Sequence, residues 1–170
     1  SGDIGRIAAP QIQGQSAYYL QLNGGKRNLS IDLNWPEARE AVLKLCHKAD
    51  VIVENFRPGT MKTFGLDYES VRQQNPAVVY VSMSGFGQNT PWSTRPAFAP
   101  TVQAESGATQ TQMDHFGDDL LQPVTDWASH ADVYTGLEGA IAVLAGLNKR
   151  NATGTGLHGD VSMMAAMLAV

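Results

Sequence analysis

Several side chains in this sequence could do chemistry, but most of them lack the neighbours that such chemistry needs. Ser84 follows Met83, where a serine nucleophile elbow of the GxSxG type would require a Gly-x pair. The four histidines do not fall at metal-ligand spacing, and there is no CxxC pair, GxGxxG loop or Walker A lysine loop. These patterns therefore give no reason to expect a metal ion, a nicotinamide dinucleotide or a P-loop nucleotide.

A carboxylate offers a different kind of chemistry, because an ionised side chain can attack a carbonyl carbon and form a covalent intermediate. Asp132 lies in the run HADVYTG, residues 130–136, a few residues before an apolar helical pattern. Taken alone, this position favours an ordinary helix-surface or capping aspartate. Asp126 is a nearby rival, and beside Thr125 it fits a helix cap better than a nucleophile.

The order of the predicted elements indicates a parallel α/β fold. We predict a strand over residues 27–33, a helix from Asn34 to about Cys46, a strand over 50–53, a short helix over 67–74 and a strand over 78–83. Alternating strands and helices imply parallel crossovers. Ligands of such sheets gather at the carboxyl ends of the strands, so we expect one beside the loops after Val53 and Met83.

The second half of the chain is predicted to differ. Residues 87–125 are rich in Thr, Gln, Pro, Asp and Gly, which indicates a long surface excursion with a short helix near residues 102–106. Residues 126–148 predict one long helix, or two helices broken near Gly136. The helix is indicated by apolar residues that recur at spacings of four and three, namely Leu137, Ile141, Leu144 and Leu147.

Composition limits the class of protein. With 170 residues, 43% of them hydrophobic and 16% charged, the chain predicts a globular domain. A net charge of -4 gives no sign of a nucleic-acid partner, and no apolar run is long enough to predict a membrane span. The lone Cys46 excludes an internal disulfide and fits the reducing cytoplasm. The apolar stretch over residues 162–170 stops without a capping signal, which predicts a chain that is incomplete at both ends.

Six blocks of this sequence, in order, resemble family III of the CoA-transferases, the CaiB/BaiF type that includes formyl-CoA transferase and carnitine CoA-transferase. The most specific block is DVIVENFRPG at residues 50–59, which is similar to the family signature ADVVVENFRPG. The others are LNGGKRNLSIDL at 22–33, NPAVVYVSMSGFG at 75–87, RP at 95–96 with QAESG at 103–107, TGTG at 153–156 and DVS at 160–162.

The resemblance implies a fold and a division of the chain. The fold would be the Rossmann-like, parallel-sheet portion of the large domain of a family III CoA-transferase. Residues 1–125 would form a partial CoA-binding region with the excursion over 87–125. Residues 126–170 would hold the helix that carries the catalytic aspartate and the start of the next strand and helix.

The resemblance also implies an activity, namely transfer of CoA between acyl-CoA thioesters and carboxylic acids. Asp132 matches the carboxylate that attacks the thioester and later carries CoA as an aspartyl thioester. The ligands would be coenzyme A, as acyl-CoA, and a small carboxylic acid. No metal, nucleic acid or membrane partner is expected. Family members form interlocked dimers, so we expect a homodimer or a higher oligomer.

Six further residues are predicted to contact CoA through this resemblance. Asn55 and Phe56 would lie along the CoA, and Ile31, at the end of the first predicted strand, would border the adenine. Lys62 and Arg95 are candidate partners for the phosphates. Lys62 is one position away from the family's basic contact, which falls at Thr63. Phe98 completes the set.

Phe98-Ala99 departs from the family pattern and leaves alternatives open. Transferases of the family usually carry Tyr-Asp there, whereas its racemases carry His-Asp. Racemisation needs that histidine as an acid/base group, so Phe98 argues against a racemase-like enzyme. The loss of the aspartate keeps a second alternative open, a truncated non-catalytic module that binds CoA or a partner.

Overall fold

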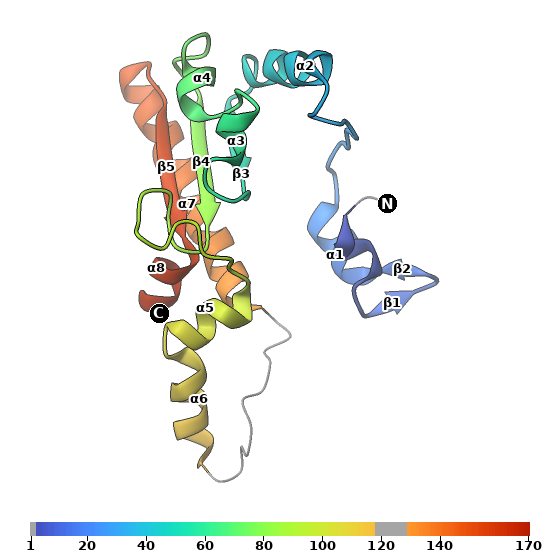
Figure 1. Cartoon of the computed structure of the whole chain (residues 1–170), viewed down its shortest axis with the longest axis vertical. Coiled ribbons are helices and arrows are strands. Elements are labelled where there is room, and N and C mark those ends of the chain that lie inside the picture. Colours follow the sequence, from blue (N-terminus) through green and yellow to red (C-terminus); the bar gives the residue numbers. More distant parts are fainter. Residues whose placement is uncertain (1–2, 118–128) are drawn as a thin grey trace. The chain divides into compact units, whose positions relative to one another are not determined.

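The computed structural model describes residues 3–117 and 129–170. The chain forms two compact units, Ser1–Ala38 and Arg39–Val170, and each is described here by itself (Figure 1). The functional division that we predict at residue 125 stays a prediction.

The first unit is built from short elements. A 3-10 helix η1 (Ile4–Ile7) is followed by the antiparallel pair β1 (Gln11–Ile12) and β2 (Gln15–Ser16) and by helix α1 (Ala17–Asn23). The Ser16 hydroxyl caps α1 by accepting a hydrogen bond from the Tyr19 N–H at 3.1 Å.

The strand predicted over residues 27–33 is wrong. These residues form no strand and have no ladder partner among the described residues, and Leu29 and Ile31 are exposed. Alternation of apolar and polar residues favours an extended chain, but a strand also needs a neighbour to take its backbone hydrogen bonds. Helix α2 (Pro36–Cys46) then begins at Pro36, as predicted.

The second unit contains a parallel sheet, which confirms the predicted α/β class. Its strands are β3 (Val51–Glu54), β4 (Val79–Ser84) and β5 (Leu157–Ser162), in the order β3-β4-β5. Val79 pairs with Val51 on one side and with Leu157 on the other. The helices of this unit are α3 (Thr60–Thr63), α4 (Tyr68–Arg72), α5 (Ala99–Glu105), α6 (Ala108–Phe116), α7 (His130–Thr153) and α8 (Met163–Leu168).

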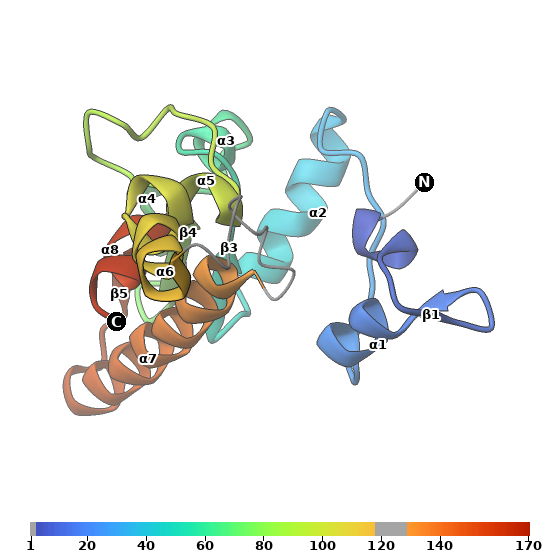
Figure 2. The same cartoon turned by 90° about the horizontal axis from the view of Figure 1, so that it is seen from below.

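The two faces of the central strand β4 have different neighbours. Val79 and Met83 project toward helix α7, which runs along the sheet (Figures 1 and 2). Tyr80 and Ser82 project to the other face, where the Tyr80 hydroxyl donates a hydrogen bond to the Leu66 carbonyl at 2.9 Å. The apolar side of β4 therefore holds the long helix, and its polar side is left for hydrogen bonding.

Helix α7 approaches the sheet through glycines. A methyl group added to Gly146 would lie 2.5 Å from Val79 Cγ1, and one added to Gly139 would lie 2.7 Å from Met83 Sδ. At Gly146 only a residue without Cβ allows this separation, because the short Val79 side chain cannot move aside. The chain then turns at Gly156, where an added methyl group would collide with the Val78 carbonyl oxygen, and enters β5.

The second half of the chain differs in detail from the prediction. In its described part, up to residue 117, the excursion after β4 contains the helices α5 and α6 rather than one short helix near residues 102–106. Helix α7 is continuous through Gly136, which confirms one long helix over the alternative of two helices broken there. It begins at His130, and Asp126 lies outside the described residues. Within the described part of the chain, no helix has the length and apolar character that a membrane crossing requires.

Candidate active site at the carboxyl ends of the strands

The loop after β3 is fixed by its own side chains. Asn55 donates a hydrogen bond from Nδ2 to the Met83 carbonyl at 3.0 Å, which ties the loop to β4. The Phe56 N–H donates to Glu54 Oε2 at 2.8 Å, and Glu54 is buried. The ring of Phe56 is 52% exposed, so a fixed backbone presents a free aromatic surface at the carboxyl end of β3.

Asp132 lies toward the same edge of the sheet. Gly146 packs near the start of β4 and Gly139 near its end, so α7 runs antiparallel to the strand. Asp132 is seven residues before Gly139, which is about 10 Å farther along the helix axis at 1.5 Å per residue. Its carboxylate is therefore carried beyond the carboxyl end of β4, toward the edge from which the Asn55–Phe56 loop leaves the sheet.

The electrostatic surroundings of Asp132 act in two directions. The side chain reaches solvent, yet the protein atoms around it desolvate the carboxylate and raise the pKa of Asp132. Asp132 also lies in the first turn of a 24-residue helix, where the backbone N–H groups favour a negative charge. Such an acid is more basic than an ordinary surface aspartate and still has neighbours that stabilise its ionised form.

A small hydrophobic cluster supports the turn that carries Asp132. Ala131 is fully buried there, together with Phe86, Ala99, Val102, Met163 and Met167. The Ala131 N–H donates a hydrogen bond to Gln103 Oε1 at 3.4 Å. The sequence analysis assigned no role to Gln103 or Ala131, and their only sequence signal was the match of Gln103 to a family block.

The two predicted phosphate partners have different surroundings. Lys62 lines a cavity of about 240 Å³ whose wall includes Arg57, Tyr68 and His158. Arg95 donates from Nη2 to Glu105 Oε1 at 2.6 Å, and its guanidinium carbon lies 5.0 Å from the centre of the Trp92 ring. Lys62 is thus directed to a cavity, whereas the charge of Arg95 is already engaged within the protein.

Phe98 and Ile31 complete the predicted set. Phe98 is the N-cap residue of α5 and is 74% exposed. Since α5 packs against α7, Phe98 belongs to the same half of the unit as Asp132. Ile31 lies in the first unit, in an irregular segment rather than at the end of a strand. Asn55, Phe56 and Asp132 thus lie toward one edge of the sheet, whereas Lys62 lines a cavity on its polar face. The structure gives Ile31 no place relative to them.

The polar face of the sheet holds a pair that the sequence analysis missed. Ser82 Oγ and His158 Nε2 lie 2.9 Å apart, and the His158 ring stacks on Tyr68 with ring centres 5.1 Å apart. Ser82 and His158 line the same cavity as Lys62. The available signal was the alternation of Tyr80, Ser82 and Ser84 along a strand that is otherwise apolar.

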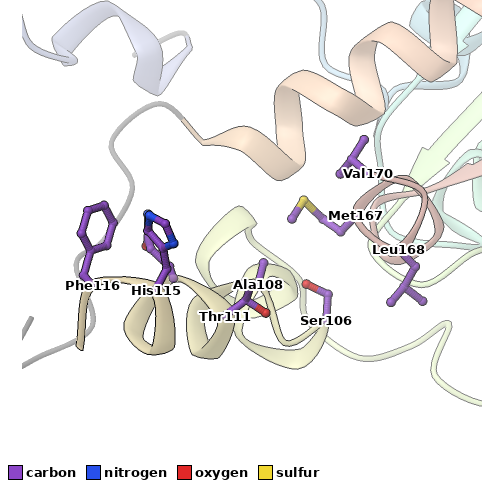
Figure 3. A pocket seen from close by; sticks show the side chains of 9 residues that line it. Ser106, Ala108, Thr111, His115, Phe116, Met167, Leu168 and Val170 are labelled. Carbon is purple, nitrogen blue, oxygen red and sulfur yellow. The ribbon is translucent and has the colours of Figure 1, made fainter.

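A larger cavity, of about 530 Å³, lies between α6 and α8. Figure 3 shows His115 and Phe116 on one side and Met167 and Leu168 on the other. None of the predicted site residues lines it. Over residues 3–117 and 129–170, no three His, Cys, Asp or Glu side chains gather in a group that could hold a metal ion.

Comparison with known proteins identifies the group to which this arrangement belongs. The family described as CoA-transferase family III has a model that matches residues 1–170. The chain belongs to CoA-transferase family III. The resemblance carried by the ENFRPG block and the five other blocks is therefore confirmed.

Two relatives within CoA-transferase family III illustrate the degree of similarity. The succinyl-CoA:mesaconate CoA-transferase of Haloarcula hispanica is 34% identical over 178 residues, which cover 99% of this chain and 44% of the relative. The succinate–glutarate CoA-transferase of Agrobacterium fabrum is 36% identical over 155 residues, 91% of this chain and 38% of the relative. The chain thus spans less than half the length of these curated relatives.

A solved structure agrees with the family assignment. A CaiB/BaiF family protein from Brucella suis superposes with a TM-score of 0.87 at 35% identity, over 99% of this chain and 45% of that one. The sheet and helices described above are therefore those of a portion of a family III CoA-transferase.

Proposed function

We propose that this chain carries the nucleophile and part of the CoA site of an enzyme that transfers CoA between acyl-CoA thioesters and carboxylic acids. The proposal depends above all on the position of Asp132. A solvent-accessible carboxylate with a raised pKa stands in the first turn of α7. That turn lies toward the edge of the sheet from which the Asn55–Phe56 loop leaves β3.

The exchange is a series of acyl transfers through Asp132. A carboxylate oxygen bonds to the thioester carbonyl carbon, the C–S bond breaks, and a mixed anhydride and CoA thiolate result. The thiolate then attacks the aspartyl carbonyl, the donor acid leaves, and CoA is held as an aspartyl thioester. The acceptor carboxylate repeats these two steps in reverse, which gives the new acyl-CoA and restores the free carboxylate. This series of steps replaces one difficult displacement with several easier ones.

The surroundings of Asp132 suit this role. Desolvation makes the carboxylate more basic and hence more nucleophilic, while the N-terminal end of α7 favours its ionised form. Ala131, buried beside it, holds the turn in the cluster beneath.

CoA would be held by residues with unequal roles. Asn55 and Phe56 would lie along the CoA, and Lys62 would approach its phosphates from the cavity that it lines. Ile31 would border the adenine, and Phe98 would face the bound ligand from the start of α5. Arg95 would contribute least, because a phosphate would compete with Glu105 for its guanidinium.

The relatives indicate which substrates to try first. The two described above are named for succinyl-CoA with mesaconate and for succinate with glutarate, so dicarboxylic acids are the proposed acyl groups and acceptors. A cytoplasmic location and a homodimer or higher oligomer are part of the proposal. The lone Cys46 supports the location, and the family resemblance supports the oligomer.

A second candidate is a module that binds CoA without exchange. It is favoured by Ala99, which stands where the family's transferases usually have an aspartate. A racemase-like activity has less support, because Phe98 cannot exchange protons.

The test is to trap the covalent intermediate. The purified chain would be incubated with succinyl-CoA and treated with hydroxylamine or borohydride, and modified peptides would be mapped by mass spectrometry. We expect one modified residue, Asp132, and no adduct in Asp132→Asn. Glu138→Gln is the matched control, since it removes a carboxylate from the exposed part of the same helix.

The three candidates give different results. An adduct on Asp132 in the wild-type chain supports the transferase. Binding of CoA by calorimetry without any adduct supports the binding module. Deuterium exchange alpha to the thioester, without an adduct, would support a racemase-like enzyme.

A further inference from the structure

The helix that carries Asp132 begins without a cap of its own. Ser129 is its N-cap residue and adopts a left-handed conformation, with φ 49° and ψ 53°. An N-cap residue is usually extended, and its side chain then accepts a hydrogen bond from an N–H of the first turn. Ser129 makes no such side-chain bond, so the Ala131 N–H in the first turn takes its acceptor from elsewhere.

Gln103 supplies an acceptor from a different helix. It lies in α5, 28 residues earlier in the chain, and its Oε1 accepts the Ala131 N–H at 3.4 Å. The bond is long, so its geometry depends on how firmly the two helices are held. The Ser129 carbonyl accepts the next two N–H groups, from Asp132 at 2.9 Å and from Val133 at 3.1 Å.

Packing holds both partners of this bond in place. Val102 and Ala131, the neighbours of Gln103 and Asp132 respectively, are fully buried in the same cluster. The C-terminal residue of α5, Glu105, is tied to Arg95 by the 2.6 Å ion pair. The amide of Gln103 is therefore presented to the α7 terminus by a supported helix rather than by a free surface side chain.

We propose that Gln103 is a positioning residue for Asp132, acting through the first turn of α7. This inference rests on the role proposed for Asp132. Loss of the acceptor would leave the Ala131 N–H without a protein partner and would loosen the turn on which the carboxylate stands. Attack of the Asp132 carboxylate on the thioester carbonyl carbon is sensitive to such a displacement, because a shift of about 1 Å can cost about 100-fold in rate.

The test compares two substitutions of similar size. Gln103→Met keeps the length of the side chain and removes the acceptor, whereas Gln103→Glu keeps an acceptor. Gln110→Met is the control, because Gln110 lies in α6 and bonds to Asp114 rather than to α7. Two quantities would be measured for each 170-residue variant: hydrogen exchange of the Ala131 amide, and the single-turnover rate of adduct formation at saturating succinyl-CoA.

We expect Gln103→Met to speed exchange of the Ala131 amide about tenfold and to slow adduct formation at least tenfold. The apparent affinity for succinyl-CoA should stay unchanged, since Gln103 is assigned no contact with CoA. Gln103→Glu should restore the protection of Ala131 and most of the rate. Gln110→Met should match the wild-type chain in both measurements.

The outcomes separate this inference from the proposed function. Wild-type protection of Ala131 in Gln103→Met would overturn the positioning role, even if the wild-type chain forms the adduct. A wild-type adduct rate in Gln103→Met would overturn it as well. Absence of an adduct in the wild-type chain contradicts the role of Asp132 and with it the catalytic purpose of the positioning. In that case the exchange data would still show whether Gln103 holds the turn.

Discussion

Helix α7 reverses the usual arrangement of a helix in a globular protein, in which the large apolar residues pack inward. The face that packs inward is made of small residues, and Ala131, Thr135, Gly139 and Gly146 are its buried members. The opposite face carries the large apolar residues, and Leu137, Ile141 and Leu144 are 59%, 57% and 66% exposed. Because small residues let the helix backbone approach β4 closely, the contact with the sheet depends on the absence of side chains rather than on their bulk. The face of α7 that contacts the sheet is therefore identified by its glycines and not by large apolar residues.

The largest effect on stability is expected when a bulky side chain is added to the inner face of α7 at Gly146. In Gly146→Val, the first carbon of the new side chain would lie 2.5 Å from Cγ1 of Val79, which is fully buried in the central strand. Overpacking of this kind costs about 1–3 kcal/mol or more, and neither backbone can move freely. We expect the free energy of unfolding to fall by about 3 kcal/mol, measured by urea denaturation followed by circular dichroism.

Gly136→Ala is the matched control for Gly146→Val on the same helix. No heavy atom lies within 4 Å of the site where its new methyl group would stand. Alanine favours helix over glycine by about 1 kcal/mol, so this variant should be more stable than the wild-type chain. A loss of stability in both variants would contradict the assignment of the two faces.

A smaller effect is expected at Gly139. The added methyl group of Gly139→Ala would lie 2.7 Å from Met83 Sδ, which belongs to a flexible side chain that can move. The overpacking cost is partly offset by the helix preference of alanine, so the free energy of unfolding should fall by about 1 kcal/mol. Adding Met83→Ala should remove most of the interaction between the two sites, and a double-mutant cycle measures it. Strict additivity of the two changes would show that Gly139 does not face Met83.

The smallest effect on stability is expected on the outer face. Leu137→Gln and Leu144→Gln change exposed side chains, so the free energy of unfolding should move by less than about 0.5 kcal/mol. Losing more than that would mean that these leucines are covered in solution. Sedimentation velocity at several concentrations distinguishes cover by a second chain from cover within one chain, because only the former depends on concentration.

The sequence predicted β3, β4 and α7 of the second unit well, because local signals were strong there, whereas β5 was expected only from the family resemblance. β3 is a short run of β-branched residues, β4 begins with two valines around Tyr80, and α7 has a clear helical period. The direction of the α7 faces could not be predicted in the same way. Periodicity shows that apolar residues share a face, but whether a neighbour covers that face is decided by residues far away in the chain.

The candidate site was predicted in part. Asn55 and Phe56 came from a matched block and Asp132 from the family resemblance, and the fold carries them toward the same edge of the sheet. Ile31 was placed at the end of a strand that does not form, because no local signal reveals a missing pairing partner. The bonds from Gln103 to Ala131 and from Ser82 to His158 join residues 28 and 76 positions apart, and no local pattern connects them.

Gly156 has a consequence for the accuracy of folding. Only a residue without Cβ fits against the Val78 carbonyl oxygen, and Gly156 also donates its N–H to the Pro76 carbonyl at 3.0 Å. If β5 slipped by one residue along β4, Thr155 or Leu157 would meet that carbonyl and clash. The same slip would turn His158 and Asp160 toward α7 and bring Leu157 and Val161 to the polar face. Gly156 thus permits only one register of β5 on β4, because a strand shifted by one residue would clash where β5 begins.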